Sequence, residues 1–172
     1  MTAVALMACL AGTSLWGASA FAAPNKKPIK PVGKECGEVV GFKSERHVAI
    51  RKVDGNYIYA RIAWLKRLPE SGNTFQSRVV TDRATYGKEA CATIWKVYGT
   101  EVVDSSRGRK ALKVYADVDV KGVGNLTEWM LKKGLGMLDE ATARKVLPPE
   151  KVSFLKAEQI QAQKEHRGIW DK

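Results

Sequence analysis

The sequence has few of the residues that bind zinc. It contains three cysteines and two histidines among 172 residues, and the cysteines form no CxxC motif. His47 and His166 lie far apart, and neither has a second ligand at helical spacing. Zinc sites in proteins combine three or four such ligands, usually in closely spaced pairs. The composition therefore argues against a zinc site.

Charged residues are absent from the first 22 residues, Met1 to Ala22. This segment contains the apolar run from Val4 to Leu10 and ends in Ala20-Phe21-Ala22, the small-x-small pattern that signal peptidase recognises. The apolar run is shorter than a membrane-spanning helix requires. The alternative is that the segment is not cleaved and anchors the protein in the membrane. We predict that residues 1–22 are a cleaved signal peptide and that the protein is exported, either to a periplasm or out of the cell.

Acidic residues are scarce relative to basic ones. The chain has 18 Asp and Glu against 29 Lys and Arg, which gives a net charge of +11. A positive field of this size attracts phosphates over about a Debye length. Nucleic acid or another polyanion is therefore the predicted partner. The alternative is that the charge only maintains solubility or contacts an anionic cell surface.

Two cysteines remain after the predicted cleavage, because Cys9 leaves with the leader. In an oxidising compartment an even pair predicts one disulfide, here between Cys36 and Cys91. The alternative is two separately buried thiols.

The mature chain divides into an arm and one folded domain. Residues 23–34 interleave three prolines with four lysines, which favours an extended arm. The domain is predicted over residues 35–172. Its first part is rich in β-branched and aromatic residues, and Asp54-Gly55 is a strong hairpin signal. Three antiparallel strands are predicted over Gly37–Phe42, His47–Val53 and Tyr57–Leu65.

The remaining elements follow from periodicity and turn residues. Residues 71–85 are polar with little periodicity, which predicts a loop. Residues 86–98 place Ala90, Ile94, Trp95 and Tyr98 on one face of a predicted helix. A second hairpin is predicted over residues 101–104 and 110–118, then a short helix over 125–133. A last helix opens at Pro148-Pro149, ends at Gly168 and points Val152, Leu155 and Ala162 inward.

The order of these elements predicts the fold class. Three strands, a helix, two strands and two further helices describe an α+β protein. The five strands fit an OB-type Greek-key β-barrel, with about three packed helices.

Several segments of the domain resemble the staphylococcal nuclease-like, or thermonuclease-like, family. They keep the family's order and near-native spacing from Glu35 to Trp170. The matching segments are Gly37-Glu38-Val39-Val40, Pro69-Glu70, Tyr86-Gly87-Lys88-Glu89-Ala90, Gly108-Arg109 with Val114-Tyr115-Ala116-Asp117, Leu131 to Leu135, and Ala157-Glu158 with the terminal Gly168-Ile169-Trp170.

The resemblance implies the barrel fold and a phosphodiesterase site. Family members cleave DNA and RNA with a bound calcium ion, a carboxylate that orients or activates water, and two arginines on the phosphate. Carried over by position, the carboxylate corresponds to Glu70 and the second arginine to Arg109. The first arginine falls on Ile62, so Arg61 can serve only if a bulge restores the direction of its side chain.

The calcium positions depart from the family pattern. The chain reads Ser44-Glu45-Arg46-His47 and Arg67-Leu68-Pro69-Glu70, so arginines replace both metal carboxylates. Calcium requires hard oxygen ligands, and this exchange reverses the local field. No cofactor or metal is therefore expected.

Two functional hypotheses from different classes remain. In the first, a divergent member binds nucleic acid or another polyanion through Arg46, Arg67 and Arg109 without hydrolysing it. In the second, an active exported nuclease uses Glu70 and Arg109 with an altered metal requirement, or none. Two of the candidate site residues also have a purely structural interpretation. Glu70 can neutralise a neighbouring arginine, and Arg61 can be a solvated strand residue.

Overall fold

The computed structural model describes residues 29–69 and 72–171. Five strands and a two-residue extension form one sheet, which four helices and a short 3-10 helix flank. The strands are β1 (Gly33–Ser44), β2 (His47–Arg51), β3 (Tyr57–Ile62), β4 (Glu89–Asp104), β5 (Arg109–Val120) and β6 (Gly124–Asn125). The helices are α1 (Gly72–Thr85), α2 (Leu126–Lys132), α3 (Glu140–Ala143), α4 (Pro149–Lys164) and the 3-10 helix η1 (Gly168–Trp170).

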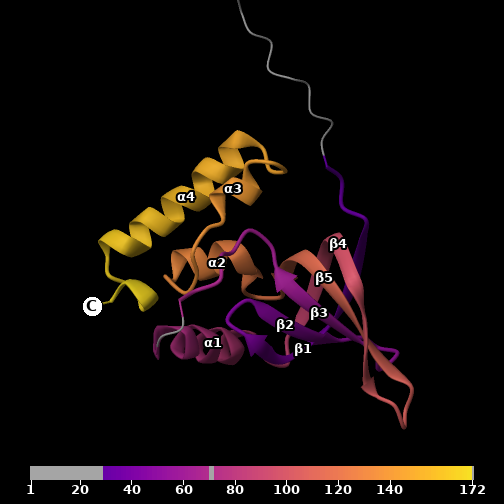
Figure 1. The fold of residues 1–172 in the computed structure, drawn as a ribbon. Coiled ribbons are helices and arrows are strands. Elements are labelled where there is room, and N and C mark those ends of the chain that lie inside the picture. The colour runs from indigo at the N-terminus through magenta and orange to yellow at the C-terminus, as the bar shows by residue number, and fades with distance from the viewer. Residues whose placement is uncertain (1–28, 70–71, 172) are drawn as a thin grey trace, which may run out of the picture.

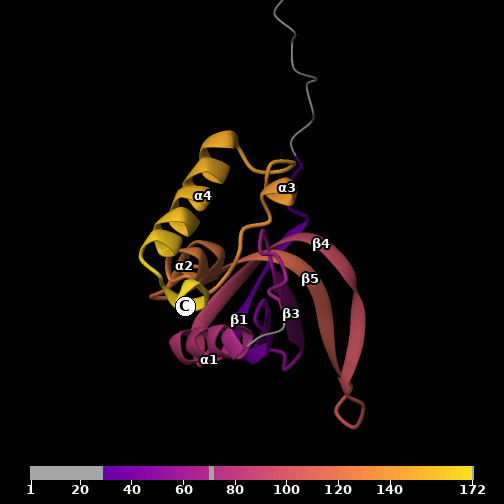
Figure 2. The ribbon, with the colours of Figure 1, turned by 60° about the vertical axis from the view of Figure 1, so that its left-hand side comes forward.

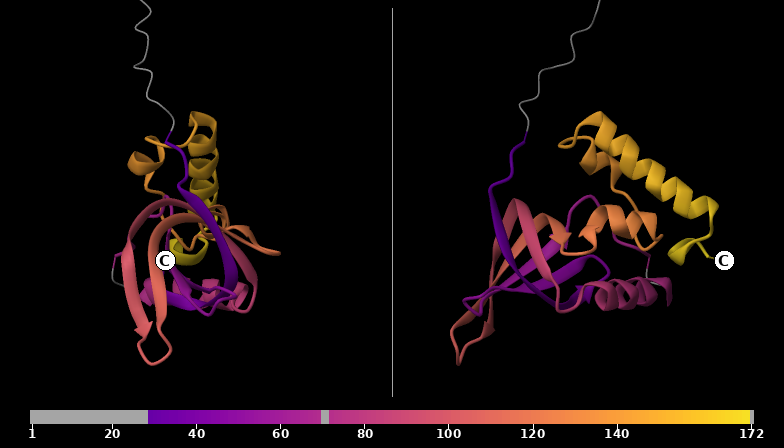
Figure 3. Two further views of the ribbon diagram at one scale, coloured as in Figure 1. Left: turned by 90° about the vertical axis from the view of Figure 1, so that its right-hand side faces the viewer. Right: turned by 180° about the vertical axis from the view of Figure 1, so that it is seen from behind.

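The sheet closes into a barrel. Its strand order is β3-β2-β1-β4-β5-β6, and an additional parallel pairing of β3 with β5 joins the two sides. Strand β1 contributes to both sides, because its first half pairs with β4 and its second half with β2. The closed ring of strands is visible in Figure 3. The predicted α+β fold, an OB-type five-stranded barrel with packed helices, is confirmed.

Alternation of apolar and polar residues forms the barrel wall. In β3, Ile58, Ala60 and Ile62 are fully buried, whereas the residues between them are only partly buried. Side chains alternate between the two faces of a strand, so Tyr57, Tyr59 and Arg61 lie on the outer face. The strand ends three residues before its predicted end at Leu65.

The first helix was predicted in the wrong segment. Residues 72–85, predicted as a loop, form α1, and residues 86–98, predicted as a helix, lie mostly in β4. In β4 the buried residues are Ala90, Ala92 and Ile94, which repeat every two residues. A separation of four fits both one helical turn and two strand repeats, so Ala90 and Ile94 could not distinguish the two structures.

Helix α1 lacked an apolar signal because its inward face is polar. Ser77, Thr81 and Thr85 are fully buried. Their hydroxyls donate to the carbonyls of Leu135, Ser77 and Thr81, respectively. Hydroxyls satisfied in this way can be buried at little cost, so the helix packs on the barrel without a stripe of large apolar residues.

The C-terminal helices lie on one side of the barrel (Figure 1). Asn125 caps α2, and the side chain of Asn125 accepts from the backbone N–H of Glu128. Helix α4 begins at Pro149 and buries Val152, Leu155 and Ala162, as predicted. It ends at Lys164 and not at Gly168, which begins η1, and the four-residue helix α3 was not predicted. None of the helices in the described residues is long and apolar enough to cross a membrane.

Two glycines let the end of the chain approach α2. Gly134 and Gly168 both have positive φ, and the carbonyl of Gly134 accepts from the N–H of Ile169 at 2.8 Å. A Cβ on Gly168 would lie 2.3 Å from that carbonyl oxygen. A larger residue at Gly168 would therefore separate η1 from α2.

A disulfide joins β1 to β4. Cys36 and Cys91 face each other in the register, with their Cα atoms 4.1 Å apart. The predicted pairing is confirmed, and the alternative of two separate thiols is excluded. Cys91 lies on a strand, however, and not on a helix as predicted.

The predicted second hairpin is present and longer than expected. Strands β4 and β5 pair as far as Asp104 and Arg109, around a turn at residues 105–108. Strand β1 accompanies β4 only as far as Ile94. The end of the hairpin therefore extends beyond the barrel, on the side opposite the helices (Figures 2 and 3).

Candidate functional site

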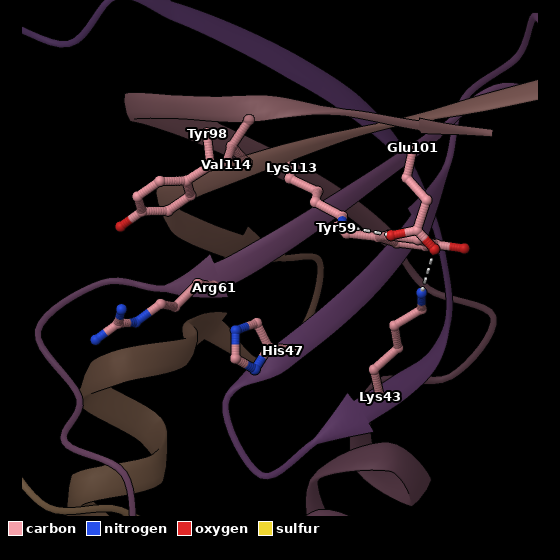
Figure 4. A pocket seen from close by; sticks show the side chains of 8 residues that line it. All are labelled: Lys43, His47, Tyr59, Arg61, Tyr98, Glu101, Lys113 and Val114. Carbon is pink, nitrogen blue, oxygen red and sulfur yellow. Dashed lines mark ion pairs between the residues drawn. The ribbon is translucent and has the colours of Figure 1, made fainter. Parts of the chain in front are cut away.

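A groove with a volume of about 550 Å³ lies on the outer face of the barrel. Each of the five barrel strands contributes to it, and Figure 4 shows the side chains. The groove is lined by Lys43, His47, Tyr59, Arg61, Tyr98, Glu101, Lys113 and Val114.

Strand register brings these residues together. His47 of β2 is the Cα partner of Arg61 in β3. Tyr59 and Arg61 are in turn the partners of Lys113 and Tyr115 in β5. Side chains at paired positions lie on the same face of a sheet, so the register produces a continuous surface of cations and tyrosine rings.

Arg61 lies at one end of the groove (Figure 4). Its guanidinium carbon is 5.7 Å from the ring centroid of Tyr115, a cation–π contact. Its Nε atom is buried and has no hydrogen-bond partner among the described residues. A buried donor without a partner is costly, so this contact with the Tyr115 ring is the main interaction shown for the Arg61 guanidinium.

At the other end, two lysines converge on one carboxylate. Glu101 lies 2.6 Å from Nζ of Lys113 and 3.7 Å from Nζ of Lys43. The hydrogen bond from Lys113, followed by the charges of both lysines, holds the pKa of Glu101 below its usual value. The Lys43 ammonium also lies 3.5 Å from the ring centroid of Tyr59.

His47 contributes no charge at neutral pH. Burial lowers its pKa below 6.5, and the charges of Arg46 and Arg61 lower it further. One ring nitrogen, Nδ1, lies 2.6 Å from Oγ of Ser44. The groove therefore carries three cations and one carboxylate, and its net charge is positive.

A second basic cluster adjoins the groove. Arg46 feels the charges of both Arg61 and Arg67, and its pKa is lowered by burial first and by Arg61 next. Its Nε lies 3.8 Å from the buried Glu45, and its Nη1 donates to the carbonyl of Leu65 at 3.3 Å. The structure thus brings together Arg46, Arg61 and Arg67, three of the residues singled out in the sequence.

Arg109 lies elsewhere. It begins β5, six residues before the Tyr115 that pairs with Arg61, a distance of about 20 Å along a strand. A Cβ on Gly55 would lie 3.5 Å from Nε of Arg109, so this arginine packs at the β2–β3 turn. Arg61 and Arg109 therefore do not converge on one site, although the resemblance implies that they would. Glu70 lies outside the described residues.

Among the described residues there is no group of three or more His, Cys, Asp or Glu side chains that could hold a metal ion. Glu45, the carboxylate closest in sequence to the expected calcium positions, faces Arg46.

A buried polar cluster supports the groove from behind. The indole N–H groups of Trp64 and Trp95 donate to the two carboxylate oxygens of Asp117, at 3.0 and 3.1 Å. Burial raises the pKa of Asp117, and these hydrogen bonds oppose that shift. The backbone N–H of Trp64 donates to the Tyr115 hydroxyl at 2.8 Å, and burial raises the pKa of that tyrosine to about 12. This cluster fixes the ring against which Arg61 rests.

Most of the groove was not singled out in the sequence. Lys43, Tyr59, Tyr98 and Lys113 come from four different strands, and only the closed register places them together. The alternation of Tyr57, Tyr59 and Arg61 within one predicted strand was a usable signal, because it puts two aromatic rings and a cation on one face.

Comparison with known proteins found no match, either to a family model or to a curated protein. The resemblance to thermonuclease-like proteins therefore rests on the sequence segments given above.

Proposed function

We propose that this chain is a divergent thermonuclease-like protein that binds single-stranded nucleic acid in the groove without hydrolysing it. The observation that carries the proposal is the alternation of Tyr59 and Tyr98 with Lys43, Arg61 and Lys113 on one barrel face. Proteins that bind single strands combine cations for the phosphates with aromatic rings for the bases. OB-type barrels bind oligonucleotides on the face of their second and third strands, and β2 and β3 contribute His47, Tyr59 and Arg61 to the groove.

The tyrosines favour nucleic acid over other polyanions. A polyphosphate or sulfated polysaccharide would need only the cations. A base can also stack on a ring, which contributes about 1–3 kcal/mol per base. Tyr98 is half exposed and available for such stacking. Bases within a duplex are already stacked on each other, so the rings favour single strands.

Binding is favoured over hydrolysis by the positions of the arginines. Arg46 and Arg67 stand where the resembling family has calcium carboxylates, and Arg109 lies at the β2–β3 turn. A hydrolytic site would need neutralising groups converging on one phosphate. The described residues supply Arg46, Arg61 and Arg67 for this purpose, and Arg109 does not join them.

We further propose that the protein is exported. The disulfide supports folding in an oxidising compartment, which agrees with the signal peptide predicted over residues 1–22.

Fluorescence anisotropy tests the binding proposal. A labelled oligothymidylate should bind at low salt, more tightly than a duplex or polyphosphate of equal charge. Replacing Arg61 and Lys113 by Gln should remove two phosphate contacts. The slope of log K against log salt should then fall by about 1.4, at about 0.7 per contact.

The matched control is the double variant Lys145→Gln and Lys164→Gln, because both lysines are exposed in the helical layer. This variant should retain the wild-type slope. Equal losses in both double variants, or tighter binding of polyphosphate, would reject the groove as a nucleic-acid site. Incubation with plasmid and RNA in calcium, magnesium, manganese or chelator should leave both intact.

A further inference from the structure

Glu101 stands out as the one carboxylate among the cations of the groove. It comes from the part of β4 beyond Ile94, where β1 no longer accompanies the hairpin. From there it reaches ammonium groups on two other strands, Lys43 of β1 and Lys113 of β5 (Figure 4). The side chains of the three residues are each 40–48% exposed.

The arrangement has the geometry of an anion-binding site. Two ammonium groups on separate strands point at one pair of oxygens, as they would at a phosphate. Lys43 is also positioned by its contact with the Tyr59 ring, so the two cations stand beside an aromatic surface. A phosphate at this point would have its neighbouring base close to Tyr59.

We propose that Lys43 and Lys113 form a phosphate subsite and that the carboxylate of Glu101 occupies it in the free protein. A nucleic-acid phosphate then replaces the carboxylate of Glu101 between the two lysines. The Glu101 side chain rotates away from them, and both lysines stay in place. This inference rests on the proposed function. It adds that the side chain of Glu101 competes with nucleic acid for the phosphate subsite.

The exchange is physically accessible. Ion pairs at this exposure are weak, because water screens them and long side chains lose freedom when they pair. A phosphate diester carries the same formal charge as the carboxylate, and it brings further contacts at Arg61 and at the rings. Glu101 therefore reduces affinity without closing the groove. Removing its charge should strengthen binding about 3- to 10-fold at low salt.

The test compares Glu101→Gln with Glu89→Gln. Glu89 lies on the same strand, pairs with one lysine, Lys121, at 2.9 Å, and lies outside the groove. Both variants raise the net charge by one unit; Glu101→Gln loses two lysine partners and Glu89→Gln loses one. Anisotropy with labelled oligothymidylate should show 3- to 10-fold tighter binding for Glu101→Gln and a change below twofold for Glu89→Gln. Equal changes in the two variants, or weaker binding by Glu101→Gln, would overturn the exchange.

A second background keeps the inference separate from the proposed function. In a Lys43→Gln, Lys113→Gln protein, adding Glu101→Gln should change the affinity by less than twofold, because only the general effect of one charge is left once the subsite is gone. A 3- to 10-fold gain that persists there would refute the subsite. If the wild-type protein shows no salt-dependent binding, the proposed function fails first. If it binds through Arg61 but Glu101→Gln behaves as Glu89→Gln does, only the exchange fails.

Discussion

Removal of the disulfide between Cys36 and Cys91 should destabilise the domain mainly through the unfolded chain. Cys36 is exposed and Cys91 only partly buried, so replacing both by Ser leaves almost no cavity. The loss should come from the freedom of the unfolded chain, since the bond closes a loop with a sequence separation of 55. In the chain-entropy model such a loop is worth about 4 kcal/mol.

Urea unfolding of the oxidised wild type and the double Ser variant measures this difference. For a domain of this size, about 4 kcal/mol corresponds to a fall in Tm of about 15 °C. Wild-type protein kept reduced should match the variant, and titration of denatured, unreduced wild type without residues 1–22, and so without Cys9, should find no free thiol. A loss below about 1 kcal/mol would refute the reasoning, because the loop would then be constrained without the bond.

Three further predictions follow from single contacts. Millimolar calcium should not raise the Tm, because Arg46 and Arg67 stand at the two positions where the resemblance to thermonuclease-like proteins implies calcium-binding carboxylates, and micromolar stoichiometric binding by calorimetry would contradict this. Tyr115→Phe should lower the free energy of unfolding in urea by about 1–3 kcal/mol, because it leaves the N–H of Trp64 without its acceptor. A loss below about 0.5 kcal/mol, which is about the noise of such measurements, would show that this hydrogen bond does not stabilise the fold. The folded-state pKa of His47 lies below its unfolded value of 6.5, so the unfolded chain binds more protons as pH falls through this value. Stability should therefore drop between pH 7.5 and 5.5 by more in the wild type than in His47→Gln, and equal drops would contradict the shift.

The barrel could be predicted because its strands carry local signals. Asp54-Gly55 and the alternation of Tyr57 to Ile62 each specify a strand or turn without reference to the rest of the chain. Strand β4 and helix α1 could not be predicted, for two separate reasons. The spacing of Ala90 and Ile94 satisfies both periods, and the inward face of α1 is built from Ser77, Thr81 and Thr85.

The groove was less predictable than the fold. Its residues converge through the pairing of β3 with β5 and through the bulges of β1. Neither feature can be predicted from the pattern of a single sequence. Arg109 illustrates the difficulty. Its place in a sequence motif suggested convergence with Arg61, but the parallel register places Tyr115, and not Arg109, beside that arginine.

The central claim is that oligonucleotides bind at the groove, and an NMR titration tests it most directly. Backbone amide shifts of ¹⁵N-labelled protein would be followed as unlabelled oligothymidylate is added at low salt. The account predicts the largest shifts at the amides of Tyr59, Arg61 and Lys113, which line the groove on β3 and β5. Largest shifts at Arg109 and the β4–β5 turn, or along α4, with little change in the groove, would contradict it.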